Sequence, residues 1–469
     1  MAGIGFRLDR IAREDGLGGI ANAAFHGAVV SSGPWLMTAL AVFLLQGWTR
    51  STMVAADHAI IQTSLVYAFG VSTVITAPLA MIATRMASDR FYLGERDAIP
   101  AILLAALVWA TLASLIAGGL LFGLAGGMRP DLFLLATAIL TLFSQIWIAS
   151  PFLHATWRHR PIFLAYLCGI AMVALCLALV RPTAPAAVLA AIAAGLIVTL
   201  ALLIAAIRDD FPNSPEWRPG WIGRTPGVLA LGAAGLTNAL AIWIDKWLLW
   251  WAPGSVQAVG ALRVNPVNDQ ASFLGLLTMI PGLTLILVTT ETRFDRAFAA
   301  LMSHCMGTAN RRRIEKARQK VGMTIRLDLR LLMVEQAILA GFCWVLAPEI
   351  IRLLDMNARG IFGFRLTAVG VVFHLVAIQM SIILSYYDLA GRIVAVWGSF
   401  LLASAAGTLL FRDSGFAGFG FGYLAGAVTA ASLAVALVAE ATGKLTYLLF
   451  VGNNPAVAGN SGLWARFWP

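Results

Sequence analysis

The chain has 469 residues, of which 60% are hydrophobic and only 12% are charged. A soluble protein carries about 25% charged residues, so this composition excludes an ordinary soluble domain and indicates a polytopic membrane protein. The formal net charge of +10 does not call for a nucleic-acid partner, because Lys and Arg gather in the cytoplasmic loops of membrane proteins.

Apolar runs long enough to cross a bilayer, about 20 residues each, recur along the whole chain. The twelve predicted spans are 20–47, 59–83, 99–125, 132–153, 162–180, 186–207, 227–251, 270–290, 331–353, 362–385, 393–411 and 419–442. The first 19 residues mix acidic and basic side chains, so we expect the first span to direct insertion in place of a cleavable signal peptide. The sequence therefore predicts an all-α polytopic membrane protein.

Orientation follows from the basic residues. With the N-terminus in the cytoplasm, most of the 33 Lys and Arg residues fall on the cytoplasmic side, as the positive-inside rule requires. An even number of spans then places the C-terminus in the cytoplasm as well.

A hydrophilic segment divides the spans into two equal groups. Residues 208–225 contain three prolines and are typical of a linker. We expect a six-helix bundle over 1–207, a cytoplasmic linker over 208–225 and a second six-helix bundle over 226–469. Because six is even, both bundles enter the membrane in the same direction, which predicts a parallel pseudo-twofold repeat.

Two adjacent charges interrupt the apolar run of the seventh predicted span. Asp245 and Lys246 are costly in hydrocarbon, so they mark a candidate functional site. Adjacent helical residues point about 100° apart, so we expect each to need its own partner or water. Cavity lining, a structural ion pair and direct ion coupling all stay open. His374 and Glu335 are weaker candidates within later spans.

The predicted transport cavity extends around this pair. Trp243 and Trp247 flank it in sequence, and the following loop carries Arg263 and Asp269. Tryptophans at span ends ordinarily form an interfacial belt, but sugar rings also stack on aromatic faces. Both interpretations stay open.

Prolines inside or near the ends of spans are candidate hinges. Proline removes a backbone hydrogen bond and frees a carbonyl, and transporters use such breaks for bending and binding. The predicted hinge residues are Pro34, Pro78, Pro281 and Gly282. A packing kink without a mechanistic role is the alternative.

Charged residues recur where the predicted spans meet the cytoplasm. Such charges ordinarily anchor a helix at the interface, and in a functional alternative they close a cytoplasmic gate through ion pairs that break on movement. The candidate pairs are Arg85 with Asp89, Arg293 with Asp295, and Asp388 with Arg392. Glu291 completes the predicted gate.

The longest connection between predicted spans, 291–330, is strongly basic. Phe294, Phe298, Leu301 and Cys305 recur at helical spacing, so we expect it to begin as an amphipathic helix on the inner leaflet. Anionic lipid or a cytoplasmic partner could dock on its cations. These are Arg311, Arg312, Arg313, Lys316, Arg318 and Lys320.

The chain lacks the sequence signatures of an enzyme. It has no GxxxxGK[ST] phosphate loop, no HExxH zinc site and no D-x-D pair. The four cysteines show no C-x-x-C spacing. We therefore expect no catalytic residues, no metal and no cofactor.

The order of short motifs around the charge pair resembles a known transporter family. IWIDKW, PGS, G-x-LR, IPG and ETxF follow one another within 237–294, and the chain opens with MAGIGFRL and carries SSGPW at 31–35. This combination resembles the inner-membrane transporters of bacterial Pel exopolysaccharide systems (PelG). Compatible hydropathy runs nearly end to end.

The resemblance implies a fold of the multidrug/oligosaccharidyl-lipid/polysaccharide exporter type, located in the bacterial inner membrane. It further implies transport of a nascent, amino-sugar-rich polysaccharide across that membrane. Implied partners are a cytoplasmic glycosyltransferase and membrane proteins that respond to cyclic di-GMP.

Other functions stay open at this point. Asp245 would also suit an ion-coupled exporter of small cationic compounds, and the same fold type could flip a lipid-linked oligosaccharide. From a different class, the chain could act as a membrane scaffold that anchors a glycosyltransferase through 291–330.

Overall fold

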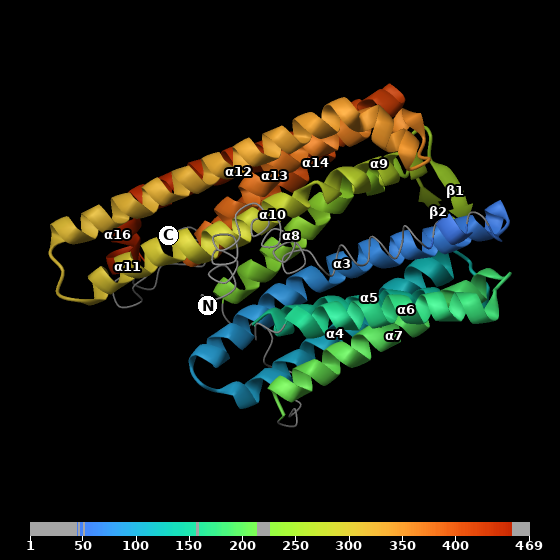
Figure 1. Cartoon of the computed structure of the whole chain (residues 1–469), viewed down its shortest axis with the longest axis horizontal. Helices are drawn as coiled ribbons and strands as arrows, with labels where there is room; N and C mark the ends of the chain where they lie inside the picture. Colours follow the sequence, from blue (N-terminus) through green and yellow to red (C-terminus); the bar gives the residue numbers. More distant parts are fainter. Residues whose placement is uncertain (1–44, 46, 50–51, 156–158, 213–225, 453–469) are drawn as a thin grey trace, which may run out of the picture. The chain divides into compact units, whose positions relative to one another are not determined.

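The computed structural model describes residues 45, 47–49, 52–155, 159–212 and 226–452 (Figure 1). These residues divide into two compact units. The N-terminal unit comprises the described residues up to Trp243 together with Ser255–Asn265. The C-terminal unit comprises Ile244–Gly254 and the described residues from Pro266 onward. The chain therefore passes from one unit to the other inside a helix and returns for a short segment.

The described residues contain 11 helical stretches that are long and apolar enough to cross a membrane. Each predicted span from 59–83 to 419–442 overlaps one of them, so the all-α polytopic fold class is confirmed. The first predicted span lies largely outside the described residues, as does most of the predicted linker 208–225. The domain boundaries proposed from that linker stay a prediction.

The N-terminal unit is a helical bundle with a short hairpin. Its elements are α3 (Ala55–Tyr92), η1 (Arg96–Ala98), α4 (Ile99–Gly118), η2 (Gly119–Ala125), α5 (Pro130–Ala155), α6 (His159–Val180), α7 (Pro185–Asp210), most of α8 (Pro226–Leu249), β1 (Val256–Val259) and β2 (Leu262–Val264). Close approach of α6 and α7 depends on small residues, since a Cβ on Gly169 would lie 2.7 Å from the Gly195 carbonyl oxygen. Such contacts are typical of helix packing in lipid.

The antiparallel β1–β2 hairpin packs on the N-terminal unit through backbone hydrogen bonds. Tyr67 of α3 donates its hydroxyl hydrogen to the Arg263 carbonyl oxygen at 2.8 Å and accepts from the Arg263 N–H at 3.2 Å. The Ala261 N–H donates to the Ala125 carbonyl oxygen at 2.8 Å. Gly260 at the turn has φ +55°, and a side chain there would overlap the Gly126 carbonyl. Glycine is therefore required at this turn.

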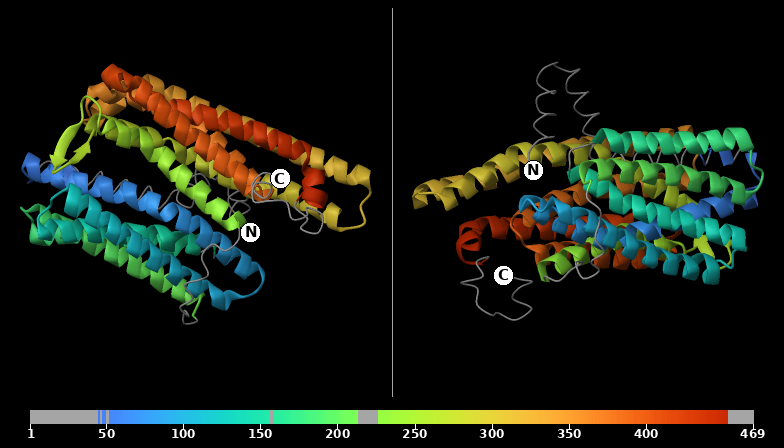
Figure 2. Two further views of the ribbon diagram at one scale, coloured as in Figure 1. Left: turned by 180° about the vertical axis from the view of Figure 1, so that it is seen from behind. Right: turned by 90° about the horizontal axis from the view of Figure 1, so that it is seen from below.

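The C-terminal unit is built around α13, most of which is buried. Its elements are the end of α8, α9 (Pro266–Leu277), α10 (Met279–Thr289), η4 (Thr290–Phe294), α11 (Asp295–Met306), α12 (Arg311–Leu353), η5 (Ala358–Gly360), α13 (Ile361–Tyr386), α14 (Ala390–Phe411), η6 (Arg412–Gly418), α15 (Phe421–Gly443), α16 (Leu445–Tyr447) and η7 (Leu448–Gly452). Helices α9, α12 and α15 pack on α13, and α14 packs on α15. Figure 2 shows α12 along the outside of this unit, with α11 beside its N-terminal half.

The basic segment 291–330 is helical over most of its length and is not a loop. Asn310 caps α12 by accepting a hydrogen bond from the Arg313 N–H at 3.0 Å, and the helix then continues without a break into the predicted span. The amphipathic helix is confirmed as α11. Its place on the inner leaflet stays a prediction, and part of its apolar face packs on protein. Phe294 and Leu301 are buried, and the Phe294 ring packs edge-on against Tyr386 of α13.

We predict that Tyr67→Phe loosens the hairpin. The change removes two hydrogen bonds to Arg263, each worth about 0.5–1.5 kcal/mol. Amide hydrogen exchange over 256–264 should become faster in purified protein. Tyr92→Phe is the matched control, because Tyr92 is 91% exposed, and it should leave exchange unchanged. Equal protection in Tyr67→Phe and wild type would contradict the assigned role.

Candidate functional site

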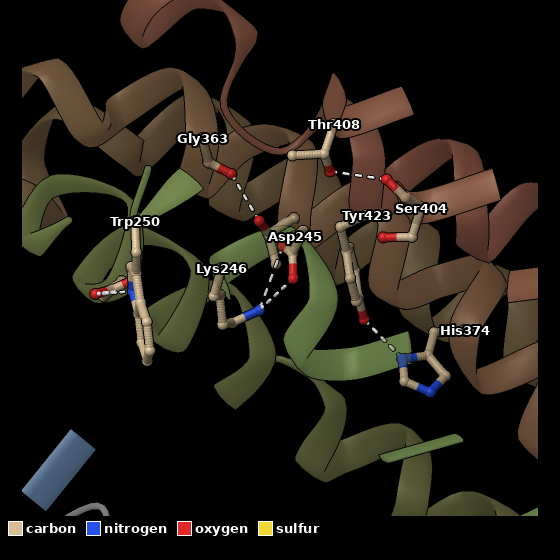
Figure 3. A network of polar contacts seen from close by, with 10 residues as sticks. Asp245, Lys246, Trp250, Gly363, His374, Ser404, Thr408 and Tyr423 are labelled. Carbon is tan, nitrogen blue, oxygen red and sulfur yellow. Dashed lines mark hydrogen bonds and ion pairs between the residues drawn. The ribbon is translucent and has the colours of Figure 1, made fainter. Parts of the chain in front are cut away.

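The charge pair of α8 lies in the core of the C-terminal unit. Asp245 and Lys246 are 3% and 4% exposed, and the Lys246 ammonium donates to the Asp245 carboxylate with Nζ–Oδ1 3.1 Å and Nζ–Oδ2 3.3 Å (Figure 3). The expectation that the two side chains do not meet is wrong. The lysine side chain is long enough to bend back along the helix surface and reach the Asp245 carboxylate, although adjacent helical residues point roughly 100° apart.

Helices α13 and α15 supply the surroundings of the pair. The Lys246 Nζ lies 5.8 Å from the centroid of the Tyr423 ring, within the range of a cation–π interaction. Tyr423 is fully buried, and its hydroxyl forms a 2.7 Å hydrogen bond with Nδ1 of His374 (Figure 3). The His374 ring also packs edge-on against Phe400 of α14. His374 is therefore held by a neighbour, as expected for a buried histidine.

This arrangement keeps the net charge of the buried pair at zero. Burying a single charge is costly, and a close counter-charge offsets part of that cost. Either charge can reach cargo or water only if the pair separates. The geometry is therefore compatible with a polar element of a transport path and with a structural ion pair. No group of His, Cys, Asp and Glu side chains in the described residues is arranged to hold a metal.

A second polar contact joins the residue that directly follows α8 to α9. The buried Trp250 indole N–H donates to both carboxylate oxygens of Asp269, with Nε1–Oδ1 3.1 Å and Nε1–Oδ2 2.9 Å. Asp269 lies in the first turn of α9, where a negative charge is favoured by the helix dipole. Asp269 thus holds the end of α8, a role that its sequence position alone did not indicate.

The other predicted cavity residues are divided between the units. Trp247 lies on the C-terminal unit's part of α8 and is half-buried. Trp243 belongs to the N-terminal unit, where its ring packs against Phe69 at 6.1 Å. Arg263 lies in β2, and its guanidinium donates to the Ser255 hydroxyl oxygen with Nη2–Oγ 2.9 Å. Of the six predicted cavity residues, Asp245 and Lys246 form a direct ion pair with each other.

The predicted hinges differ in their surroundings. Pro34 lies outside the described residues. Pro78 lies inside α3, which continues without interruption from Ala55 to Tyr92. A break does occur before Pro281, because α9 ends at Leu277 and α10 begins at Met279. Pro281 is then in the first turn of α10, where the backbone N–H groups have no intrahelical partner and a missing N–H costs little.

A side chain from α12 bridges this helix break. The amide of buried Gln336, oriented to satisfy its neighbours, donates to the Thr278 carbonyl at 3.2 Å and accepts from the Gly282 N–H at 2.9 Å. A Cβ on Gly282 would lie 2.5 Å from Leu375 Cδ1 and 2.6 Å from Gln336 Nε2. A side chain at Gly282 would therefore displace the ends of two buried side chains, and Gln336 satisfies polar groups that the break leaves open.

The predicted gate residues form contacts within single units. Arg85 and Asp89 make an exposed ion pair one turn apart on α3, with Nε–Oδ1 3.2 Å, and such pairs contribute little to stability. The predicted pairing of Arg293 with Asp295 is wrong. Arg293 pairs instead with Asp328 of α12 at 3.3 Å, because Asp328 faces the packed side of that helix and is buried.

The remaining gate candidates lie near the turn between α13 and α14. Asp388 occupies that turn with φ +58°, and Glu291 lies in η4. Arg392 is buried and pairs with Glu440 of α15, with Nη1–Oε2 3.4 Å. Glu440 was not anticipated from the sequence. Whether these contacts act as a gate stays a prediction.

One of the six predicted docking cations has a structural role. Arg318 pairs with Glu315 and donates from Nη1 to the Thr442 carbonyl oxygen at 3.0 Å, which satisfies a backbone acceptor at the end of α15. The other five are exposed on α12. They are Arg311, Arg312, Arg313, Lys316 and Lys320.

Helical periodicity could have located two of the missed residues. Buried positions along α12 recur at spacings of three and four, and the polar members of that series are Asp328 and Gln336. A polar side chain in phase with the apolar face of a helix has to find a partner in the protein. No comparable sequence pattern predicts that Tyr423 lies beside the charge pair.

We predict that the two charges of the pair depend on each other. Asp245→Asn or Lys246→Met alone leaves an uncompensated buried charge and should lower stability by about 3–5 kcal/mol. The double variant removes both charges and should be closer to wild type. Thermal unfolding of purified protein in detergent tests this, and a double variant less stable than both single variants would contradict it.

We also predict that Gly282→Ala disturbs the helix break. The added methyl group would overlap Leu375 and Gln336, and overpacking of this kind costs about 1–3 kcal/mol. Gly341→Ala on α12 is the matched control, because nothing lies within 4 Å of its Cβ position. The same thermal unfolding measurement should show a loss only for Gly282→Ala, and a loss of equal size in both variants would count against the packing argument.

Comparison with solved structures supports the exporter fold. A MOP superfamily transporter from Pyrococcus furiosus has a TM-score of 0.62 at 12% identity, covering 90% of this chain and 96% of that one. A MATE transporter in the bent conformation has a TM-score of 0.64 at 12% identity, covering 95% and 97%. An outward-facing multidrug resistance MATE transporter has a TM-score of 0.62 at 12% identity, covering 90% and 96%.

No curated protein matches the sequence. The family described as PelG, putative exopolysaccharide exporter (EPS-E), matches residues 1–450. That range includes the charge pair, the bridged helix break and all of α12. The chain therefore belongs to the PelG family of putative exopolysaccharide exporters.

Proposed function

We propose that this protein moves a nascent, amino-sugar-rich polysaccharide of the Pel type across the bacterial inner membrane. The observation that carries the proposal is the family match over residues 1–450. The exporter fold supports it, as does the buried charge pair on α8. The protein is a membrane exporter and not an enzyme, so the polymer has to be made by another chain.

The charge pair is the proposed polar element of the transport path. Charges retained within a membrane-spanning segment are costly and usually functional. An amino group on the polymer could replace the Lys246 ammonium beside Asp245, and the Tyr423 ring next to Lys246 offers an aromatic surface for a sugar. Separation of the pair would then accompany passage of the cargo. A purely structural ion pair is the competing interpretation.

The proposed partners are a cytoplasmic glycosyltransferase and membrane proteins that respond to cyclic di-GMP. Arg311, Arg312 and Arg313, exposed at the start of α12, are the proposed contact for the glycosyltransferase. This assignment places that end of α12 in the cytoplasm together with both chain termini, as the distribution of Lys and Arg favours.

We predict that the Asp245→Ala, Lys246→Ala double variant abolishes polysaccharide secretion while the protein still reaches the membrane with its partners. Removing both charges avoids a lone buried charge, so loss of export would reflect the path and not misfolding. The measurement is extracellular polymer in cells lacking their own transporter, together with membrane level and partner association.

The matched control is Arg129→Ala, Asp131→Ala, which removes an exposed pair of one basic and one acidic side chain and should secrete normally. Normal secretion by the Asp245→Ala, Lys246→Ala variant would show that the charge pair is structural. If cells without the transporter still secrete polymer, the export function itself is wrong. If charge reversal at Arg311–Arg313 abolishes secretion while removal of the charge pair does not, the protein is a scaffold for the glycosyltransferase.

A further inference from the structure

Helix α12 presents one uninterrupted exposed face. Its buried positions, such as Val321, Ile325 and Leu332, contact the rest of the C-terminal unit. On the opposite side, exposed apolar residues follow one another at spacings of three and four. They are Met323, Leu327, Leu331, Val334, Ile338, Phe342 and Val345. At 100° per residue these positions form one stripe along the helix, and such a stripe on a membrane-spanning helix faces lipid.

Exposed charges mark where the hydrocarbon begins and ends along this stripe. Arg330 is exposed at one side, and Glu349 and Arg352 form an exposed pair at the other. The stretch between them, 331–348, is roughly 27 Å long at 1.5 Å per residue, close to the roughly 30 Å of a bilayer core. Arg330 therefore lies at the edge of the hydrocarbon, and Arg326 lies one turn beyond it, roughly 6 Å away.

Arg326 and Arg330 are the exposed arginines nearest to this edge. They lie four residues apart, so they share one side of α12, next to exposed Met323 and Leu327. No acidic side chain of the described residues pairs with either arginine. Of the acidic residues nearby on α12, Glu315 and Asp328 are paired with Arg318 and Arg293. Glu335 is half-buried and, at 100° per residue, lies on the other side of the helix from both arginines.

The orientation of this surface is determined by the protein. Arg318 binds the carbonyl of Thr442 on the packed side of α12, and Val321 and Ile325 are buried on the same side. Rotating the helix to turn Arg326 and Arg330 inward would expose these contacts. The two arginines are thus held outward at the depth of the lipid headgroups, a layer of roughly 5–7 Å on each side of the hydrocarbon.

We propose that Arg326 and Arg330 bind the phosphate of an anionic membrane lipid, with the stripe residues Leu331 and Val334, which follow Arg330 on its hydrocarbon side, against the upper acyl region. Guanidinium groups bind phosphate oxygens in pairs, and apolar side chains among cations suit the headgroup boundary. The apolar stripe and the arginines form one surface, which favours lipid over a cytoplasmic protein as its occupant. The site does not depend on which cargo the protein exports.

The test measures lipid selectivity of the purified full chain in phosphatidylcholine nanodiscs. Spin-labelled phosphatidylglycerol or phosphatidylcholine is added, and electron paramagnetic resonance gives the fraction of label immobilised on the protein. Wild type should prefer phosphatidylglycerol, and Arg326→Gln, Arg330→Gln should lower that preference by about fivefold for each arginine removed. Added salt should weaken the preference, whereas millimolar inorganic phosphate at constant ionic strength should not displace the lipid.

Arg311→Gln, Arg312→Gln is the matched control. It removes the same charge from the same helix at positions roughly 27–29 Å beyond Arg330, so lipid selectivity should be unchanged. Equal losses of the phosphatidylglycerol preference in both double variants would overturn the site, because the preference would then come from the total positive charge of the helix. A full preference in Arg326→Gln, Arg330→Gln would also overturn it. Both variants are exposed substitutions and should keep the unfolding temperature of wild type. An Arg326→Gln, Arg330→Gln variant that loses only its association with the glycosyltransferase would assign the surface to protein instead of lipid.

Discussion

Backbone hydrogen bonding in hydrocarbon is the constraint on which the rest of this structure depends. With no water to satisfy peptide groups, a membrane-spanning chain has to be helical wherever it meets lipid, and any break has to be repaired by the protein. The long helices satisfy the first requirement. At Thr278 the helix is interrupted, and the buried amide of Gln336 supplies a donor and an acceptor to the groups on either side. The hairpin backbone is satisfied by its own ladder and by Tyr67 and Ala125.

Because water is absent from hydrocarbon, buried charged side chains also need partners within the protein. Asp245 and Lys246 neutralise each other within one helix, whereas Asp328 and Arg392 obtain partners from another helix. These pairs have different consequences. A pair within one helix can separate without moving that helix against its neighbours, and it is therefore suited to exchange with a charged cargo. The pairs between helices connect η4 to α12 and α14 to α15.

Helix α12 combines three tasks that the sequence presents as separate segments. Its basic start is exposed, its middle turns are held to α15 by Arg318, and its apolar length has one exposed side and one side packed on protein. Because the helix is continuous from Arg311 to Leu353, the position of its packed face determines the direction of every side chain along it. A headgroup site at Arg326 and Arg330 follows from that rigidity.

The sequence by itself determined the fold class, the spans and the candidate charge pair, because hydropathy over about 20 residues reports directly on burial in lipid and a charge within such a run is conspicuous. It also indicated the family, through the order of its short motifs. Only the tertiary structure decided the partners: Lys246 bends back to Asp245, Arg293 pairs with Asp328, and Tyr423 joins His374. Those contacts depend on the length of each side chain and on which helices pack together. The local spacing of apolar residues predicts neither. For the same reason the amphipathic face of α11 could not be assigned, since an apolar stripe looks alike whether lipid or the aromatic ring of Tyr386 covers it.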